Sequence, residues 1–233
     1  MNCRKCHKPL TERHRKQLKA DMVFTDPPYG ISLNMGWANS PSSLMEDGRH
    51  RRRNPYKPIE GDFQPFNPAH ILEAFSAVKE VFLWGGQYFM PPSQEASFIC
   101  WDKKITESAD KAPIGDFELC WSKAKHKNSM VRVLWNGMFG HRKGDDGDAR
   151  MHPTQKPVGL AFAFFERWGK DAKLIWDGYL GSGSTLIACE KTGRKCYGME
   201  IEPLYGDVIL NRWSKFTGLH PVREDGVRWS ELT

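Results

Sequence analysis

Long apolar runs are missing from this 233-residue chain, although 39% of its residues are hydrophobic. No run approaches the roughly 18 residues that a membrane-spanning helix needs, so we expect no contact with a membrane interior. The first twenty residues are basic and contain no apolar core, which argues against a secretory signal peptide. The expected compartment is the cytoplasm.

Internal repeats and low-complexity tracts are also missing, which argues against a solenoid or a long disordered linker. Six cysteines at scattered spacings suit a reducing compartment, and we expect no disulfides. Cys3 and Cys6, with His7 and His14, form half of a zinc site at most. A closed structural site needs four ligands and no second cysteine pair follows, so no metal is predicted.

The net charge of +6 and the pI near 9.0 favour a polyanionic partner, although an excess of this size is also common in proteins that bind no nucleic acid. The basic residues gather in the first twenty positions, at 49–53 and at 123–132. Such runs are as often solvated faces as they are binding surfaces.

The order of apolar patterns predicts an α/β protein with one catalytic domain. Short apolar runs of strand type alternate with segments of helical spacing and with turns rich in glycine and proline. The expected strands are 21–25, 81–84, 97–101, 117–121, 131–135, 172–176 and 196–200. The expected helices are 67–79, 158–168 and 184–191.

A glycine-rich turn at Gly181-Ser182-Gly183 lies between the strand that ends at Asp177 and the next helix. Two glycines let the backbone pass close to a ligand, although a lone G-x-G is equally a tight turn of an ordinary α/β unit. Glu200 ends the next strand, where a carboxylate can accept hydrogen bonds from ribose hydroxyls. Together these residues favour a cofactor that carries adenosine.

Three cofactors can be compared at this turn. ATP bound by a P-loop requires a lysine after the second glycine, but Ser184 follows here, and a dinucleotide fingerprint requires a third glycine where Leu186 stands. S-adenosylmethionine contains no pyrophosphate. It needs close backbone approach, an acid for the ribose and an acid such as Asp177 for its ammonium group, and it fits best.

The segment Asp26-Pro27-Pro28-Tyr29-Gly30 follows a predicted strand and forms a stiff corner, because each proline fixes φ. An exocyclic amino group is a poor nucleophile, since its lone pair is delocalised into the ring. The carboxylate of Asp26 and the carbonyl of Pro27 can accept its two N–H groups, and Tyr29 can stack on a base turned out of the duplex. The alternative is a solvent-facing turn with a capping Asp.

These motifs, in this order, resemble the amino-group-specific DNA methyltransferases of the permuted class, in which the catalytic motif precedes the cofactor motif. The resemblance covers about residues 21–217. It rests on 25–30, on His-Pro-Thr-Gln-Lys-Pro at 152–157, on 177–185 and on Gly-Met-Glu-Ile-Glu-Pro at 198–203. It implies a Rossmann-like fold that binds S-adenosylmethionine, with a mostly parallel twisted sheet and helices on both faces.

The resemblance also assigns roles to residues. The catalytic residues would be Asp26, Pro27, Pro28 and Tyr29. The cofactor-binding residues would be Thr154, Lys156, Pro157, Asp177, Tyr179, Gly181, Ser182, Gly183, Thr185 and Glu200. An acid at the first position of the corner is the commoner pattern for adenine N6, so the expected reaction is site-specific methylation of adenine. The alternatives are methylation of cytosine N4 and a decayed protein that binds cofactor and DNA without activity.

The expected partner is double-stranded DNA, bound by a monomer or a homodimer. The domain boundaries that we expect are a basic segment at 1–20, a catalytic domain at 21–218 with a target-recognition region near 103–150, and a tail at 219–233. The residues predicted to contact DNA are Arg51, Arg52, Arg53, Lys123, Lys125, Arg132 and Arg142.

Two departures from the family pattern stand out. The usual Asp-Pro-Phe before the glycines is Asp177-Gly178-Tyr179, which keeps the acid and loses the proline. The strand and Gly-Asp turn that normally precede the catalytic strand and help to hold the adenine of the cofactor are not evident before Asp21. Either that pocket is less complete or residues 219–233 supply a substitute.

Overall fold

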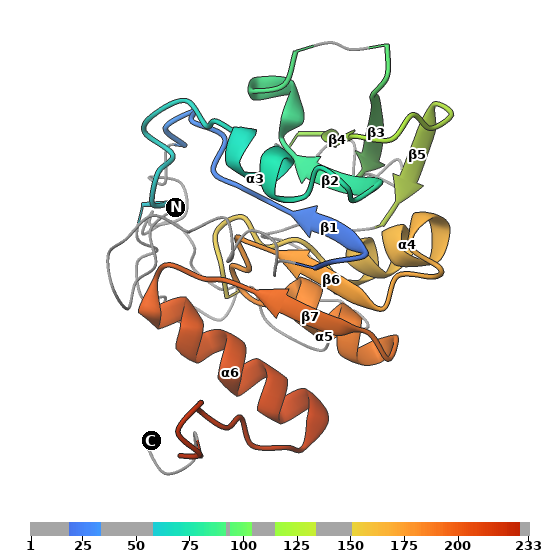
Figure 1. Cartoon of the computed structure of the whole chain (residues 1–233). Helices are drawn as coiled ribbons and strands as arrows, with labels where there is room; N and C mark the ends of the chain where they lie inside the picture. The colour runs from blue at the N-terminus through green and yellow to red at the C-terminus, as the bar shows by residue number, and fades with distance from the viewer. Residues whose placement is uncertain (1–18, 34–57, 92–93, 104–114, 134–150, 229–233) are drawn as a thin grey trace, which may run out of the picture.

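The structure, a computed structural model, describes residues 19–33, 58–91, 94–103, 115–133 and 151–228. Its centre is a seven-stranded sheet with the order β5-β3-β4-β2-β1-β6-β7 (Figure 1). The strands are β1 (Met22–Thr25), β2 (Glu80–Trp84), β3 (Ser97–Asp102), β4 (Phe117–Ser122), β5 (Ser129–Arg132), β6 (Leu174–Asp177) and β7 (Lys195–Gly198).

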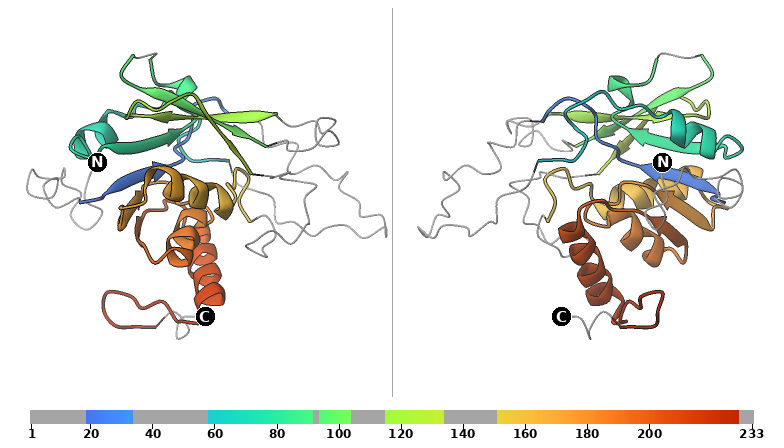
Figure 2. Two further views of the ribbon diagram at one scale, coloured as in Figure 1. Left: turned by 90° about the vertical axis from the view of Figure 1, so that its right-hand side faces the viewer. Right: turned by 60° about the vertical axis from the view of Figure 1, so that its left-hand side comes forward.

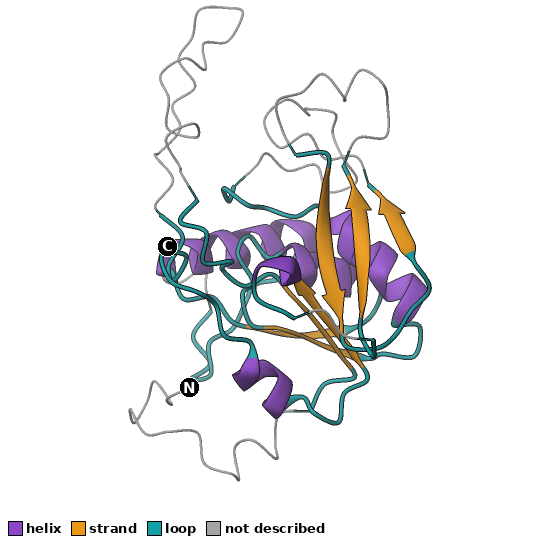
Figure 3. Ribbon diagram, turned by 90° about the horizontal axis from the view of Figure 1, so that it is seen from above, coloured by secondary structure: helices purple, strands orange, loops and turns teal. Residues whose placement is uncertain are grey.

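The sheet is mostly parallel, as expected. The pairs β1–β2, β1–β6, β6–β7 and β3–β5 are parallel, and β4 is antiparallel to both of its neighbours, β2 and β3. Six strands therefore run one way and β4 alone is reversed. Figure 3 shows the large twist between the strands at the β5 edge and those at the β7 edge. The carboxyl ends of β1, β2, β6 and β7 meet at one edge, where α/β proteins place their ligands.

Alternate residues of the central strands face opposite sides of the sheet, because the side-chain period of a strand is two. Phe24 and Trp84 belong to one buried cluster, while Val23 and Leu83 belong to another on the opposite face. Both faces of β1 and β2 are therefore covered. This explains why these strands are continuous apolar runs in the sequence.

Helices cover both faces of the sheet (Figure 2). The helix α3 (Ala69–Ala74) packs in the second cluster, while α4 (Val158–Trp168) and α5 (Ser184–Lys191) pack in the first. The helix α6 (Pro203–Thr217) contacts α5. None of the helices in the described ranges is both long and apolar enough to cross a membrane.

Most of the predicted elements are confirmed, with two changes of extent. The helix expected at 67–79 ends at Ala74, and the ammonium group of Lys123 binds the carbonyl oxygens just beyond it, including that of Val78 at 2.9 Å. The strand expected at 131–135 begins earlier and ends at Arg132. In the first case a contact from a distant part of the chain follows the end of the helix, and in the second residues 134–135 lie outside the described residues.

The sequence analysis missed α6, although its ends carry clear signals. Glu202 is the N-cap residue and accepts a hydrogen bond from the backbone N–H of Leu204, Pro203 occupies the first turn, and Gly218 closes the helix with a φ of 73°. The region 103–150, expected to recognise the target, contributes β4 and β5 to the central sheet. The paired cysteines Cys3 and Cys6 and the histidines near them lie outside the described residues.

We expect Phe164→Ala to destabilise the protein by about 3–5 kcal/mol, because the removed ring leaves a cavity in a packed core. Phe164 is fully buried, and its ring centroid lies 5.2 Å from that of Phe24 and 5.1 Å from that of Phe82. Urea unfolding measures the change. Phe162→Ala, on the exposed side of the same helix, is the control, and equal losses in the two variants would contradict this account of the core.

Candidate active site

A cavity of about 820 Å³ opens at the carboxyl ends of the parallel strands. Its wall includes Asp26 after β1, Trp84 at the end of β2, Asp177 at the end of β6 and Glu200 after β7. Cavities that hold cofactors and similar ligands measure about 300–1,000 Å³. The space is therefore large enough for a ligand of cofactor size.

The catalytic and cofactor residues predicted from the sequence converge on this cavity. All of them line it except Gly183, which is the residue immediately before α5. The catalytic corner and the glycine-rich turn are about 150 positions apart in the sequence and become neighbours because β1 pairs with β6.

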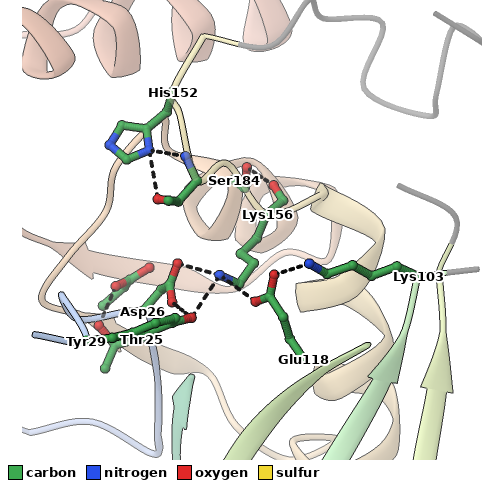
Figure 4. Close-up of polar contacts among 10 residues, drawn as sticks. Thr25, Asp26, Tyr29, Lys103, Glu118, His152, Lys156 and Ser184 are labelled. Carbon is green, nitrogen blue, oxygen red and sulfur yellow. Dashed lines mark hydrogen bonds and ion pairs between the residues drawn. The ribbon is translucent and has the colours of Figure 1, made fainter. Parts of the chain in front are cut away.

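Asp26 stands at the centre of a compact set of polar contacts (Figure 4). Its Oδ1 accepts a hydrogen bond of 2.7 Å from the hydroxyl of Tyr29, and its Oδ2 accepts one of 2.7 Å from Nζ of Lys156. The same Nζ donates to the hydroxyl oxygen of Tyr29 at 3.2 Å. Lys156, predicted as a cofactor contact, thus places its ammonium group on the carboxylate predicted to be catalytic.

Hydrogen bonds to Asp62 hold the backbone of the catalytic corner in place. The carboxylate of Asp62 accepts hydrogen bonds from the backbone N–H groups of Gly30, Ile31 and Leu33 at 2.9, 3.3 and 2.7 Å. Gly30 has a φ of 76°, and a Cβ there would lie 2.6 Å from a backbone oxygen of the chain passing opposite, so only glycine fits.

The ring of Tyr29 is backed on one side. Tyr88 stacks on it with centroids 5.4 Å apart, and a Cβ on Gly85 would collide with it at 2.1 Å. Tyr29 lines the cavity, whereas Gly85 and Tyr88 lie outside its lining. The ring is therefore fixed from outside the cavity.

Glu118 on β4 completes the charges around Asp26. Its Oε2 lies 3.0 Å from Nζ of Lys156, and its Oε1 pairs with Lys103 at the end of β3. Burial alone would raise the pKa of Glu118, but the two ammonium groups lower it to about 2. Burial raises the pKa of Asp26 despite the opposing effect of Lys156. Burial raises the pKa of Tyr29 well above its usual range, so this phenol is a donor at neutral pH.

Asp177 joins the catalytic corner to the glycine-rich turn. Its Oδ1 accepts hydrogen bonds from the hydroxyl of Thr25 at 2.7 Å and from the backbone N–H of Tyr179 at 3.1 Å. The hydroxyl oxygen of Thr25 in turn accepts from the backbone N–H of Gly178 at 3.1 Å. Burial raises the pKa of Asp177 to about 6, even though hydrogen bonds oppose the shift.

The glycine-rich turn has the backbone that the sequence predicts. Gly181 and Gly183 have φ values of 56° and 82°, in the left-handed region that favours glycine. The buried guanidinium of Arg212 on α6 supports the turn, with Nη1 donating to the carbonyl of Ser182 at 3.0 Å and to the hydroxyl of Ser184 at 3.2 Å.

Glu200 is bound to backbone. Its carboxylate accepts from the N–H groups of Gly181, Ile201 and Glu202 at 2.8, 2.9 and 2.9 Å. Two carboxylate oxygens offer about four lone-pair positions, so one remains for a ligand.

The cavity is acidic although the chain is basic. Its lining includes the carboxylates of Asp26, Glu60, Asp62, Glu118, Asp177, Glu200 and Glu202. The ammonium groups in the lining are those of Lys103 and Lys156. Such a wall favours a cationic ligand over a phosphate, because phosphates are bound by donors and positive charge.

The residues predicted to contact DNA lie in different parts of the structure. Lys123 and the exposed Lys125 follow β4 at the end of the sheet away from the cavity, and the ammonium group of Lys123 is bound to carbonyls after α3. Arg132 ends β5 at the cavity edge, with Nε 3.2 Å from Asp102. Arg51, Arg52, Arg53 and Arg142 lie outside the described residues.

Sequence reasoning missed Asp62, Glu118 and Arg212, because none belongs to a local motif. Glu118 carried one usable signal, since it is the charged residue of a strand whose other residues are apolar or aromatic except for the terminal Ser122. A buried charge in a strand needs a partner, which is a reason to look for a site.

Comparisons with known proteins place this site in context. The chain is similar to the orphan methyltransferase M.BamHII of Bacillus amyloliquefaciens, with 31% identity over 102 residues, 41% of this chain and 38% of the relative. It is also similar to the type II methyltransferase M2.LlaDCHI of Lactococcus lactis subsp. cremoris, with 22% identity over 227 residues, 84% of this chain and 82% of the relative. The match to the first relative therefore spans less than half of that protein.

Two solved structures resemble the fold. The M1.HpyAVI–SAM complex has a TM-score of 0.46 and 18% identity, over 85% of this chain and 91% of that one. The PvuII cytosine-N4-specific DNA methyltransferase has a TM-score of 0.43 and 14% identity, over 88% and 86%. The N6/N4 methyltransferase family, described as DNA methylase, matches residues 74–211. That match covers more than half of the chain, and the protein therefore belongs to the N6/N4 DNA methyltransferase family.

Proposed function

We propose that this protein transfers a methyl group from S-adenosylmethionine to the N6 amino group of an adenine that is turned out of double-stranded DNA. The observation that carries the proposal is the position of Asp26. This carboxylate is held by Tyr29 and Lys156 at the wall of an acidic cavity, next to the Asp177 carboxylate and the glycine-rich turn.

The residues present fit S-adenosylmethionine. Its ammonium and sulfonium groups give it a net positive charge, which suits the acidic lining. Asp177 would bind the ammonium, Glu200 would bind ribose with its remaining acceptor position, and Gly181 would let the backbone approach. Leu180 and Ile201 give this part of the cavity apolar surface for the adenine ring. When bound, the cofactor supplies a methyl group made electrophilic by its sulfonium sulfur.

Asp26 prepares the target nitrogen for attack. Its carboxylate accepts one N–H of the amino group and the carbonyl of Pro27 accepts the other, which draws the lone pair out of conjugation with the ring. The raised pKa of Asp26 suits a group that can also accept a proton from that nitrogen once the nitrogen has taken up the methyl group. Tyr29, fixed from outside the cavity by Tyr88, offers its ring to the base.

Adenine is proposed over cytosine because Asp occupies the first position of the corner. The DNA backbone would follow the cavity edge at Arg132, and the basic residues 51–53 and Arg142 are further candidates for phosphate contact. Residues 103–150 remain the proposed target-recognition region, within a catalytic domain that spans 21–218. The active species would be a monomer or a homodimer in the cytoplasm.

The identity of the methylated nucleoside tests the proposal. We expect radiolabelled S-adenosylmethionine and unmodified double-stranded DNA to give N6-methyladenine, which nucleoside digestion and chromatography identify. N4-methylcytosine would overturn the choice of base while keeping the reaction class. Cofactor binding without transfer to any DNA would overturn the enzymatic proposal.

Asp26→Ala should lower the transfer rate by at least about 100-fold, the scale of one preorganised group in an active site. Lys156 keeps Glu118 as a partner in this variant, so the fold and the cofactor affinity should persist. Single-turnover kinetics and calorimetric titration with cofactor separate the two effects.

Glu200→Ala is the contrasting variant, with weaker cofactor binding as its main effect. Equal loss of rate and cofactor affinity in Asp26→Ala would refute the role given to that residue.

Cofactor affinity should depend on the ionisation of Asp177. Its pKa is raised to about 6 by burial, so below that pH the free protein holds a neutral acid that binds an ammonium group poorly. The dissociation constant for S-adenosylmethionine should rise about tenfold for each pH unit below 6 and level off above it. Because the folded pKa is raised, the same group should add stability as the pH falls from about 6 towards its unfolded value near 4.

Asp177→Asn supplies the control for this pH dependence. It should bind the cofactor weakly and with little change between pH 5 and 7. A variant that keeps the wild-type slope would contradict the role given to Asp177.

A further inference from the structure

Lys156 occupies the position that the target amino group needs. Its Nζ donates hydrogen bonds to Oδ2 of Asp26 at 2.7 Å and to the hydroxyl oxygen of Tyr29 at 3.2 Å, and it forms an ion pair with Oε2 of Glu118 at 3.0 Å. It also lies 5.7 Å from the ring centroids of Tyr29 and Trp84. A base that stacks on Tyr29 from the cavity and offers an N–H group to Oδ2 of Asp26 competes with this ammonium group for that oxygen.

Among the described residues, Glu118 is the charged partner of the Lys156 ammonium group that lies outside the catalytic corner. It is on β4, two positions from Cys120, so its side chain faces the same side of the sheet as that buried residue. Its other oxygen is bound to Lys103, which fixes the carboxylate in place. A shift of the flexible Lys156 chain towards Glu118 keeps the ammonium group paired while it leaves Asp26.

We propose that Glu118 is a positioning residue for methyl transfer, which holds Lys156 so that its ammonium group releases Oδ2 of Asp26 to the amino group of the target base. This inference rests on the proposed function. Without the base, Lys156 bridges the two carboxylates. With the base bound, it remains on Glu118, and its charge stays close enough to limit protonation of Asp26.

The groups that face Asp26 determine how its pKa responds to a substitution. Lys156 faces it from the loop before α4, Glu118 and Cys120 from β4, Tyr29 from its own loop, and Asp177 from β6. Of these, Glu118 carries the negative charge that is paired with two cations. Removing that charge alone leaves Lys156 bound to Asp26.

Glu118→Gln should lower kcat/KM for DNA about 10- to 100-fold, the range for one hydrogen bond to a charged group. The dissociation constant for S-adenosylmethionine should stay within about twofold, because Glu118 acts on Asp26 and not on the cofactor. At saturating S-adenosylmethionine, where protonation of Asp177 does not limit cofactor binding, the acidic limb of the pH profile of kcat/KM should move to lower pH, since Asp26 loses a neighbouring negative charge and keeps the ammonium group. Glu118→Asp, which retains the charge, should keep the limb at its wild-type position.

A matched control is Glu80→Gln. Glu80 is a similarly buried carboxylate in an ion pair with His126 at 3.0 Å, at the end of the sheet away from the cavity. It should leave the pH profile unchanged. If Glu118→Gln fails to fold, the double variant Lys103→Gln/Glu118→Gln also removes the positive charge that Lys103 would otherwise keep without its partner. This double variant should move the acidic limb to lower pH in the same way. An unmoved limb, or a loss confined to cofactor affinity, would overturn the proposal.

A direct titration separates this proposal from the proposed function. The carboxyl carbon of Asp26, labelled with ¹³C and assigned by comparison with Asp26→Asn, should titrate at lower pH in Glu118→Gln than in the wild-type protein. This holds for the protein without DNA. Absence of methyl transfer by the wild type would defeat the proposed function, whereas an unchanged Asp26 midpoint would defeat the role of Glu118.

Discussion

The parallel pairing of β1 with β6 is the contact on which the site depends. It aligns Met22 with Ile175 and Val23 with Trp176, so both strands end at the same level. The hydroxyl of Thr25 then donates to Asp177 across the pair, between residues 152 positions apart. Asp26 and Gly178, one step further along each strand, are thereby adjacent. A slip of this pairing would turn each side chain of β1 to the opposite face and separate the catalytic corner from the glycine-rich turn.

The charges of the site are organised in two groups with different solvation. Around Asp26 and Glu118, two carboxylates and two ammonium groups are buried together, and such pairs persist only when each charge is matched, because desolvation of an isolated ion is very costly. Asp177 instead accepts hydrogen bonds from neutral donors, and burial raises its pKa to about 6. A cationic ligand would place a positive charge beside Asp177. Of the lysines and arginines in the described ranges, Lys103 and Lys156 line the cavity and the others lie outside its lining.

Local motifs were sufficient to predict most of the fold and the centre of the site. The prolines of the corner, the paired glycines and the apolar strands each act through their own backbone, so a short stretch of sequence reveals them. Asp62 and Arg212 could not be found this way, because each supports a loop that is about 30 positions away. Lys156 was recognised within its motif but given a cofactor role, since its contact with Asp26 depends on a packing arrangement that spans 130 positions. The end of α3 was misjudged for the same reason.

Among the described residues, β7 is the last strand at its end of the sheet, and the loop after it has to be held by other means. Residues 219–228 form an isolated bridge between Val222 and Arg228 and do not pair with β7, and residues 229–233 lie outside the described residues. Glu200 takes over this task by binding the N–H groups of Gly181, Ile201 and Glu202. One carboxylate therefore closes the glycine-rich turn against the loop after β7 and retains a single acceptor position for a ligand. Because Glu200 is already fixed by backbone, this end of the cavity is shaped before any ligand arrives.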